Sequence, residues 1–258
     1  DRAVDTLKYF YQKAIVYAPT FFVTATSAVR NASNKDELLN KIKLETGISV
    51  QVISGEFEAE LIYDGVKQSM NLGQENSLIM DIGGGSVEFI ICNEHQIFWK
   101  GSFEIGGQRL IDLFHHQEPM TAHEIKNEKD YLEKKLHALL AACDRHPPAT
   151  LVGASGSFDT LASMDIIQKK INVNIEDEKE YQLDMCDFYS IYNQVKPLNK
   201  PERLALPGML ELRAEMIVVS CVLIDFVLEK IKFSAIKIST YALKEGVLSR
   251  LISGEALS

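Results

Sequence analysis

Along the first part of this chain, some stretches show the apolar spacing of helices and others show the apolar runs of strands. Apolar residues recur every three or four positions from Val4 to Ile15, which predicts an amphipathic helix over residues 4–17 that Pro19 ends. Two further helices and two strands are expected here: helices over residues 34–46 and 56–66, and strands over residues 20–25 and 48–53.

Strand-like runs dominate the next stretch. Residues 77–82 and 87–92 are apolar, and residues 96–105 continue as a third strand. Glycines at 83–85 lie between the first two runs, where the chain has to turn. The pattern therefore predicts an antiparallel meander.

Helices and strands mix in the rest of the chain. Helices are expected at residues 107–115, 122–144, 157–164, 210–231 and 242–252, and strands at 150–152 and 235–238. Residues 171–207 are polar and show no readable period. Residues 210–231 are apolar nearly all round, so this helix should be central. The mixture predicts an α/β fold.

Composition narrows the classes of function. The formal net charge of −9 argues against broad nucleic-acid binding, although a small cleft can still bind phosphate through backbone amides. The longest apolar run, residues 216–228, contains Asp225 and is too short to span a membrane. The four cysteines are dispersed, which argues against a disulfide framework or a zinc site and favours the cytoplasm.

Asp81 stands at the end of an apolar strand, just before the run Gly83-Gly84-Gly85-Ser86. Glycine lets the backbone approach an anion closely, and successive N–H groups can hold phosphate oxygens. The Asp81 carboxylate could hold Mg²⁺ directly or through water. The alternative is a tight hairpin whose aspartate caps the turn, and the local sequence favours neither interpretation.

Three further side chains are candidates, each with a structural alternative. Glu88, on the next strand, could bind metal or orient water, or could be exposed on a one-sided sheet. Glu58 lies in the first turn of a helix, where the dipole alone favours an acid, but it could also be a general base. Arg30 could clamp phosphate with its guanidinium or be a surface charge.

A second corner of small residues opens a helix, and its candidate phosphate contacts are Gly153, Ser155 and Gly156. Helix N-termini bind anions through free N–H groups. The alternative is an ordinary turn from strand to helix with a serine cap. Two such corners in one chain favour phosphate binding more than either does alone.

Five segments in order resemble the exopolyphosphatase/guanosine-pentaphosphate phosphohydrolase family. They are Ala-Thr-Ser-Ala-Val-Arg-Asn-Ala at 25–32, Ile-Ser-Gly-Glu-Phe-Glu-Ala at 53–59, Asp-Ile-Gly-Gly-Gly-Ser-Val-Glu at 81–88, Gly-Ala-Ser-Gly at 153–156 and Lys-Glu-Gly-Val at 244–247. Each is modest alone, but the ordered set is specific and covers nearly the whole chain.

The resemblance implies an actin-like, ribonuclease H-like fold with two α/β lobes around a cleft. Residues 1–56 and about 240–258 would form lobe one, and residues 57–239 would form lobe two with the glycine-rich loops. The family's first phosphate loop, Asp-x-Gly-Ser-Asn-Ser, has no match, so the N-terminal strands of lobe one are expected to be missing from this sequence. The chain resembles short members that lack the C-terminal helical domain.

The resemblance also implies an enzyme and its site. Glu58 matches the family's catalytic base. Asp81 and Glu88 match acids that bind Mg²⁺ and orient the attacking water. Arg30 matches a phosphate-binding arginine. The phosphate loops correspond to Gly83, Gly84, Gly85, Ser86, Gly153, Ser155 and Gly156. The expected reaction is in-line attack of water on the terminal phosphorus of polyphosphate, with guanosine pentaphosphate as the alternative substrate.

Two other interpretations stay open. One is a non-catalytic sensor of phosphorylated ligands on the same fold. The other is an actin-like ATPase or a small-molecule kinase, against which the match at Glu58 argues. Family members often dimerise, so a homodimer is expected.

Overall fold

The computed structural model describes residues 2–17 and 21–256. Its contacts divide the chain into two compact units, one up to Gly55 and one from Glu56 onward. The first residue of the strand expected at 20–25 lies outside the described residues.

The first unit is a small α/β cluster. Its elements are α1 Arg2–Ala14, β1 Val23–Ala25, α2 Ser27–Arg30, α3 Lys35–Thr46 and β2 Val50–Val52. β1 and β2 pair in parallel. Val4, Ile42 and Ile48 form its buried core, so the apolar stripe predicted on the first helix is the face that packs. Both helices expected here are confirmed.

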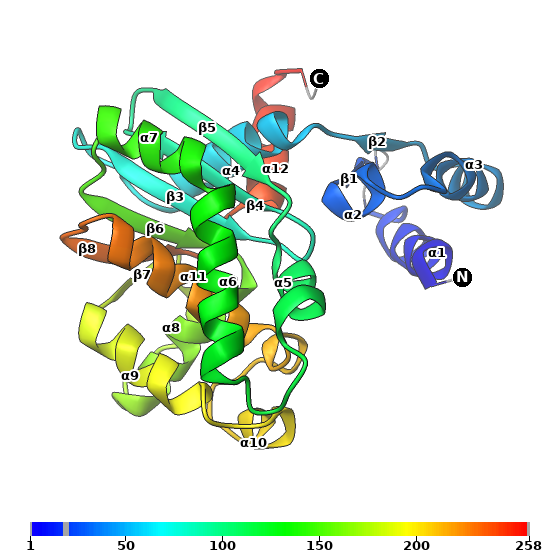
Figure 1. Cartoon of the computed structure of the whole chain (residues 1–258). Coiled ribbons are helices and arrows are strands. Elements are labelled where there is room, and N and C mark those ends of the chain that lie inside the picture. Colours follow the sequence, from blue (N-terminus) through cyan, green and yellow to red (C-terminus); the bar gives the residue numbers. More distant parts are fainter. Residues whose placement is uncertain (1, 18–20, 257–258) are drawn as a thin grey trace. The chain divides into compact units, whose positions relative to one another are not determined.

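The second unit is built on a six-stranded mixed sheet (Figure 1). Its strands are β3 Ser77–Ile82, β4 Val87–Cys92, β5 Ile97–Phe103, β6 Thr150–Ala154, β7 Glu180–Leu183 and β8 Ala235–Ser239. The order is β5-β4-β3-β6-β8-β7, with β3, β6 and β8 parallel and the other three strands antiparallel to their neighbours. The predicted meander and the α/β class are confirmed.

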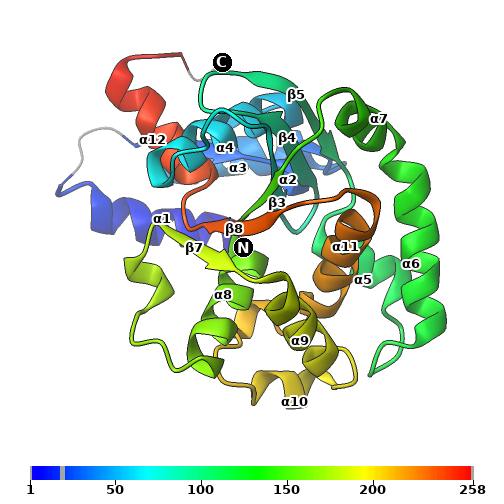
Figure 2. The ribbon, with the colours of Figure 1, turned by 90° about the vertical axis from the view of Figure 1, so that its left-hand side faces the viewer.

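Helices cover both faces of this sheet (Figure 2). They are α4 Gly55–Ser69, α5 Gly107–Phe114, α6 Ala122–Lys135, α7 His137–Arg145, α8 Gly156–Gln168, α9 Met185–Val195, α10 Lys200–Leu204, α11 Ile217–Lys230 and α12 Leu243–Ser253, with short 3₁₀ turns η1 Ile175–Asp177 and η2 Glu211–Arg213. α4 and α12 pack on one face, and α6 and α11 lie over the other. Alternate residues of β3 supply the two cores, since Met80 faces α11 and Ile79 faces α4.

Two helices differ from the sequence prediction. The helix expected at 122–144 is two helices, because the backbone leaves helical geometry at the fully buried Leu136. The helix expected at 210–231 begins only at Ile217, because the more polar residues before it form η2. β7, α9 and α10 fill the segment in which the sequence showed no period. None of the helices in the described part of the chain is both long and apolar enough to cross a membrane.

α4 and α12 cross at a backbone contact between two glycines. A Cβ on Gly246 would lie 1.7 Å from the carbonyl oxygen of Leu61, and one on Gly65 would lie 1.9 Å from that of Ala242. This crossing groups α12 with the second unit. The expected grouping of residues 240–258 with lobe one therefore differs from the division that the contacts give.

Glu128 is an unpaired acid in the interface between α6 and α11. It is fully buried, and neither carboxylate oxygen has a hydrogen-bond partner in the described structure. Burial raises the pKa of Glu128 well above its ordinary value. The folded state therefore holds a proton that the unfolded chain releases above about pH 4.3, so stability falls as the pH rises from there towards the folded-state pKa.

Glu128→Met is expected to stabilise the protein. Removing a buried polar group without partners should raise the free energy of unfolding by about 1–3 kcal/mol. The gain should be larger at pH 8 than at pH 5, because only the wild-type carboxyl titrates. Thermal unfolding at both pH values measures it. Glu133→Met, on an exposed part of the same helix, is the control and should change stability by less than about 0.5 kcal/mol. An unchanged or lower midpoint for Glu128→Met at pH 8 would contradict the prediction.

Candidate active site

The β3–β4 hairpin places Asp81 and Glu88 side by side. They lie directly opposite each other in the antiparallel register, so both side chains leave the same face of the sheet. This is the face under α4, because Ile79 and Ile90 belong to the core that α4 covers. Asp81 is 6% exposed and Glu88 is 1% exposed. The alternative that Glu88 is an exposed strand residue is therefore wrong.

Glu58 brings a third buried carboxylate to this place from the first turn of α4. Burial raises the pKa of Glu88 to about 8, and the charges of Glu58 and Asp81 add to the effect. Hydrogen bonds from Ser102 and Ser86 oppose it, and the Ser102 hydroxyl lies 2.6 Å from the Glu88 carboxylate. The site thus gathers three carboxyl groups in a region of low polarity, where the charged form of Glu88 is disfavoured.

The Gly83–Ser86 loop is braced by the start of α5. The Gly83 amide donates to the Ser86 carbonyl at 3.0 Å, and amides of residues 106–108 donate to the carbonyls of residues 83–85 at 2.9 to 3.2 Å. A Cβ on Gly106 would lie 2.5 Å from the backbone of Gly84 and Gly85, so this approach requires glycine. Within residues 21–256, the amides of Gly84 and Gly85 have no backbone partner. They are placed to bind an anion.

The second corner lies beside Asp81. Ala154, the last residue of β6, pairs with Asp81 across the parallel ladder. Ser155 follows with φ 70°, a conformation that non-glycine residues rarely adopt and that clusters at functional sites. Burial raises the pKa of Asp81, whereas a hydrogen bond from the Ser155 side chain lowers it. Gly156 begins α8, so the helix N-terminus opens at this corner.

Gly153 has a packing role in the structure. It lies within β6, and a Cβ there would come within 2.0 Å of the Phe158 ring. Small size at this position lets α8 approach the sheet. A direct phosphate contact of Gly153 stays a prediction.

Arg213 is a site residue that the sequence did not indicate. Its guanidinium lies against the second corner, since a Cβ on Gly156 would be 2.3 Å from its Nε. Its charge lowers the pKa values of Asp81 and Asp159, against the effect of burial. The pKa of Asp159 still rises to about 6, and its Oδ1 has no hydrogen-bond partner in the described structure. Arg213 therefore places a positive charge close to Asp81 and Asp159.

Arg30 belongs to the first unit, where its Nη1 donates to the carbonyl of Ile53 at 2.9 Å. This bond links the end of α2 to the chain just before α4. Whether Arg30 meets phosphate together with the second unit stays a prediction.

A sequence model of the Ppx/GppA phosphatase family matches residues 1–255 of this chain. The chain belongs to this family. Exopolyphosphatase 1 of Mycobacterium tuberculosis is 24% identical over 258 residues, which cover 99% of this chain and 74% of the relative. The bifunctional 3-dehydroquinate synthase/phosphatase of Fusobacterium nucleatum is 29% identical over 214 residues, covering 80% of this chain and 31% of the relative.

Solved Ppx/GppA-type structures share the fold. An exopolyphosphatase from Cytophaga hutchinsonii superposes with a TM-score of 0.96 at 46% identity, covering 100% of this chain and 83% of that one. The Aquifex aeolicus member of the Ppx/GppA family superposes with a TM-score of 0.81 at 25% identity, covering 98% and 81%. The resemblance inferred from the five segments is thus confirmed, and the protein is an enzyme of a phosphatase family.

The carboxylates of this Ppx/GppA chain fit a magnesium ion that phosphate helps to hold. Among residues 2–17 and 21–256, no three His, Cys, Asp or Glu side chains form a metal site of their own. Mg²⁺, however, usually takes one or two protein carboxylates, with water and substrate phosphate completing its shell. Asp81 and Glu88 supply such a pair, and burial raises both pKa values, so their charged forms are disfavoured unless a cation such as Mg²⁺ stabilises them.

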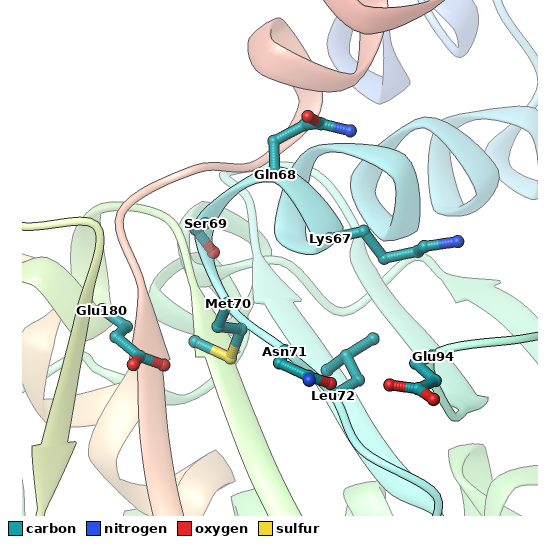
Figure 3. A pocket seen from close by; sticks show the side chains of 8 residues that line it. All are labelled: Lys67, Gln68, Ser69, Met70, Asn71, Leu72, Glu94 and Glu180. Carbon is teal, nitrogen blue, oxygen red and sulfur yellow. The ribbon is translucent and has the colours of Figure 1, made fainter.

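The second unit has one cavity that reaches the Asp159 side of the site and another that lies away from it. One of about 460 Å³ reaches Asp159 and is also lined by Tyr241 and Lys244. The other, of about 390 Å³, is lined by the end of α4 and the segment after it, with Glu94 and Glu180 (Figure 3). No predicted site residue lines the second cavity, so it is not part of the candidate active site.

Proposed function

We propose that this protein is an exopolyphosphatase, which releases the terminal orthophosphate of inorganic polyphosphate by attack of water. The observation that carries the proposal is the meeting of Glu58, Asp81 and Glu88 beside two loops suited to phosphate. The Cytophaga and Mycobacterium relatives named as exopolyphosphatases favour this substrate class.

Glu58 is the proposed general base. A buried carboxylate with a second carboxylate nearby can accept the proton of an attacking water, and such proton transfer typically contributes about 10²–10⁴-fold to a rate. Glu88 is proposed to help orient that water, with Ser102 holding its carboxylate at 2.6 Å. Both side chains leave elements of the compact second unit, which favours a fixed geometry.

Phosphate is proposed to bind between the two corners. The Gly83–Ser86 loop would bind it through the amides of Gly84 and Gly85, while the bond from the Gly83 amide to the Ser86 carbonyl holds this loop closed. Ser155 and Gly156 would bind it from the other loop, with Gly153 supporting that loop. Arg213 supplies positive charge, and a fixed donor of this kind stabilises the charge that develops in phosphoryl transfer. Asp81 and Glu88 would hold Mg²⁺, whose bound charge neutralises phosphate oxygens.

Release of orthophosphate from polyphosphate and from guanosine pentaphosphate, with Mg²⁺ or with a chelator, tests the proposal. We expect Mg²⁺-dependent turnover and a higher kcat/KM on polyphosphate. A higher kcat/KM on guanosine pentaphosphate would replace the proposed substrate. Tight polyphosphate binding without turnover would instead indicate a sensor, and the proposed function would then be wrong.

A further inference from the structure

Arg203 on α10 is a fully buried arginine that the proposed reaction leaves unused. A buried guanidinium is costly unless its donors are paired, and here they are. Its Nε donates to the Ala214 carbonyl at 2.7 Å, and its Nη1 donates to the Leu198 carbonyl at 2.7 Å. Nη1 and Nη2 also bind the two carboxylate oxygens of Glu118, at 3.1 and 2.8 Å.

These bonds join Arg203 to three segments, of which the one with Glu118 is 85 residues away in sequence. Leu198 precedes α10, Glu118 lies between α5 and α6, and Ala214 directly follows Arg213 at the end of η2. A two-pronged arginine–carboxylate contact fixes both distance and orientation. Arg203 therefore holds the carbonyl next to Arg213 at a set position relative to the α5–α6 connection.

Met216 completes the support of Arg213. The Arg213 Nη1 lies 3.2 Å from the Met216 sulfur, and the Met216 amide donates to the Arg213 carbonyl at 3.0 Å. Met216 also touches the start of α5, because a Cβ on Gly107 would lie 3.3 Å from its Cβ and its sulfur. Arg213 thus contacts Met216 directly, and Arg203 binds the carbonyl of Ala214, the next residue along the chain.

The support reaches both phosphate loops. Gly107 donates its amide to Gly83 at 2.9 Å, so Met216 packs on the residue that braces the first loop. Arg213 itself packs on Gly156 in the second loop. A displacement of η2 would therefore move Arg213 relative to both corners.

We propose that Arg203, with Glu118 and Met216, positions the Arg213 guanidinium for binding of the substrate's phosphate. This inference rests on the proposed function, since it takes Arg213 to be a phosphate ligand. Arg203 itself touches no substrate and acts through Arg213.

A double-mutant cycle in the full chain separates positioning from general support of the fold. The four proteins are wild type, Arg203→Lys, Arg213→Ala and the double variant, and the probe is tripolyphosphate with Mg²⁺, measured by calorimetry. Arg203→Lys keeps the charge but loses the fork, so it should raise Kd about tenfold. In the Arg213→Ala background the same change should have an effect of less than about twofold, because the two residues act as one unit.

Equal losses in both backgrounds would overturn the proposal, as would an unchanged Kd for Arg203→Lys. If Arg203→Lys fails to fold, Met216→Leu enters the same cycle, with an expected loss of about two- to tenfold that disappears without Arg213. Met185→Leu, a half-buried methionine of the same core, is its control and should leave Kd unchanged. The cycle measures binding and does not depend on turnover. If the two substitutions were non-additive in Kd but the protein did not release phosphate, only the proposed reaction would be refuted. Absent tripolyphosphate binding by the wild type would refute the positioning role.

Discussion

Glu58→Gln is expected to lower kcat for phosphate release by about 10²–10⁴-fold, the usual contribution of a general base. The amide has nearly the shape of the carboxylate but cannot take a proton from water. Because Glu58 lies in a buried helical turn against two other carboxylates, the loss of its charge should not unfold the protein. Substrate affinity should change little, since the base acts mainly in the transition state.

Steady-state phosphate release, with thermal unfolding as a check of the fold, measures this effect. Glu56→Gln is the matched control, because Glu56 is an exposed acid in the same helical turn. The control should keep kcat within about twofold of the wild type, as surface changes usually do. If Glu58→Gln retained near-normal kcat, Glu58 would not be the general base. That result would not refute the other proposed site residues.

Arg213→Ala should reduce kcat/KM by about 10²–10³-fold, comparable to the loss of one preorganised donor in a transition-state site. The guanidinium lies against Gly156 and offsets the charges of Asp81 and Asp159. Its removal leaves these acids to repel an incoming phosphate. Both binding and turnover should therefore suffer.

Arg213→Lys and Arg145→Ala are measured beside Arg213→Ala, the first as a conservative variant and the second as a control. The lysine keeps a charge without the planar fork, so its kcat/KM should fall between those of the wild type and Arg213→Ala. Arg145 ends α7 and is exposed, so its loss should leave kcat/KM unchanged. A value for Arg213→Ala within twofold of the wild type would remove Arg213 from the site.

Local sequence predicted the hairpin that carries Asp81 and Glu88, because two apolar runs flank a glycine turn and the side-chain period is two. It could not tell whether Glu88 is exposed or buried, because that depends on α4 covering this face. Glu58 posed the same difficulty. An acid in a first helical turn satisfies the dipole in any helix, and only tertiary packing brings it to Glu88.

Arg213 escaped prediction for a different reason. The apolar residues of α11 predict a helix that begins earlier, with Arg213 in its first turns. In the structure η2 turns the chain there, and the contact with Gly156 joins segments distant in sequence. Single-sequence patterns carry no signal for such a pairing.

The crossing of α4 and α12 has a mechanical consequence for the catalytic base. The two helices touch through their backbones, so a side chain at Gly65 or Gly246 would force them apart. The contact at Gly246 is to the Leu61 carbonyl, one turn beyond Glu58. A side chain at Gly246 would therefore be expected to displace the part of α4 that carries Glu58, and with it the carboxylate proposed to act on water.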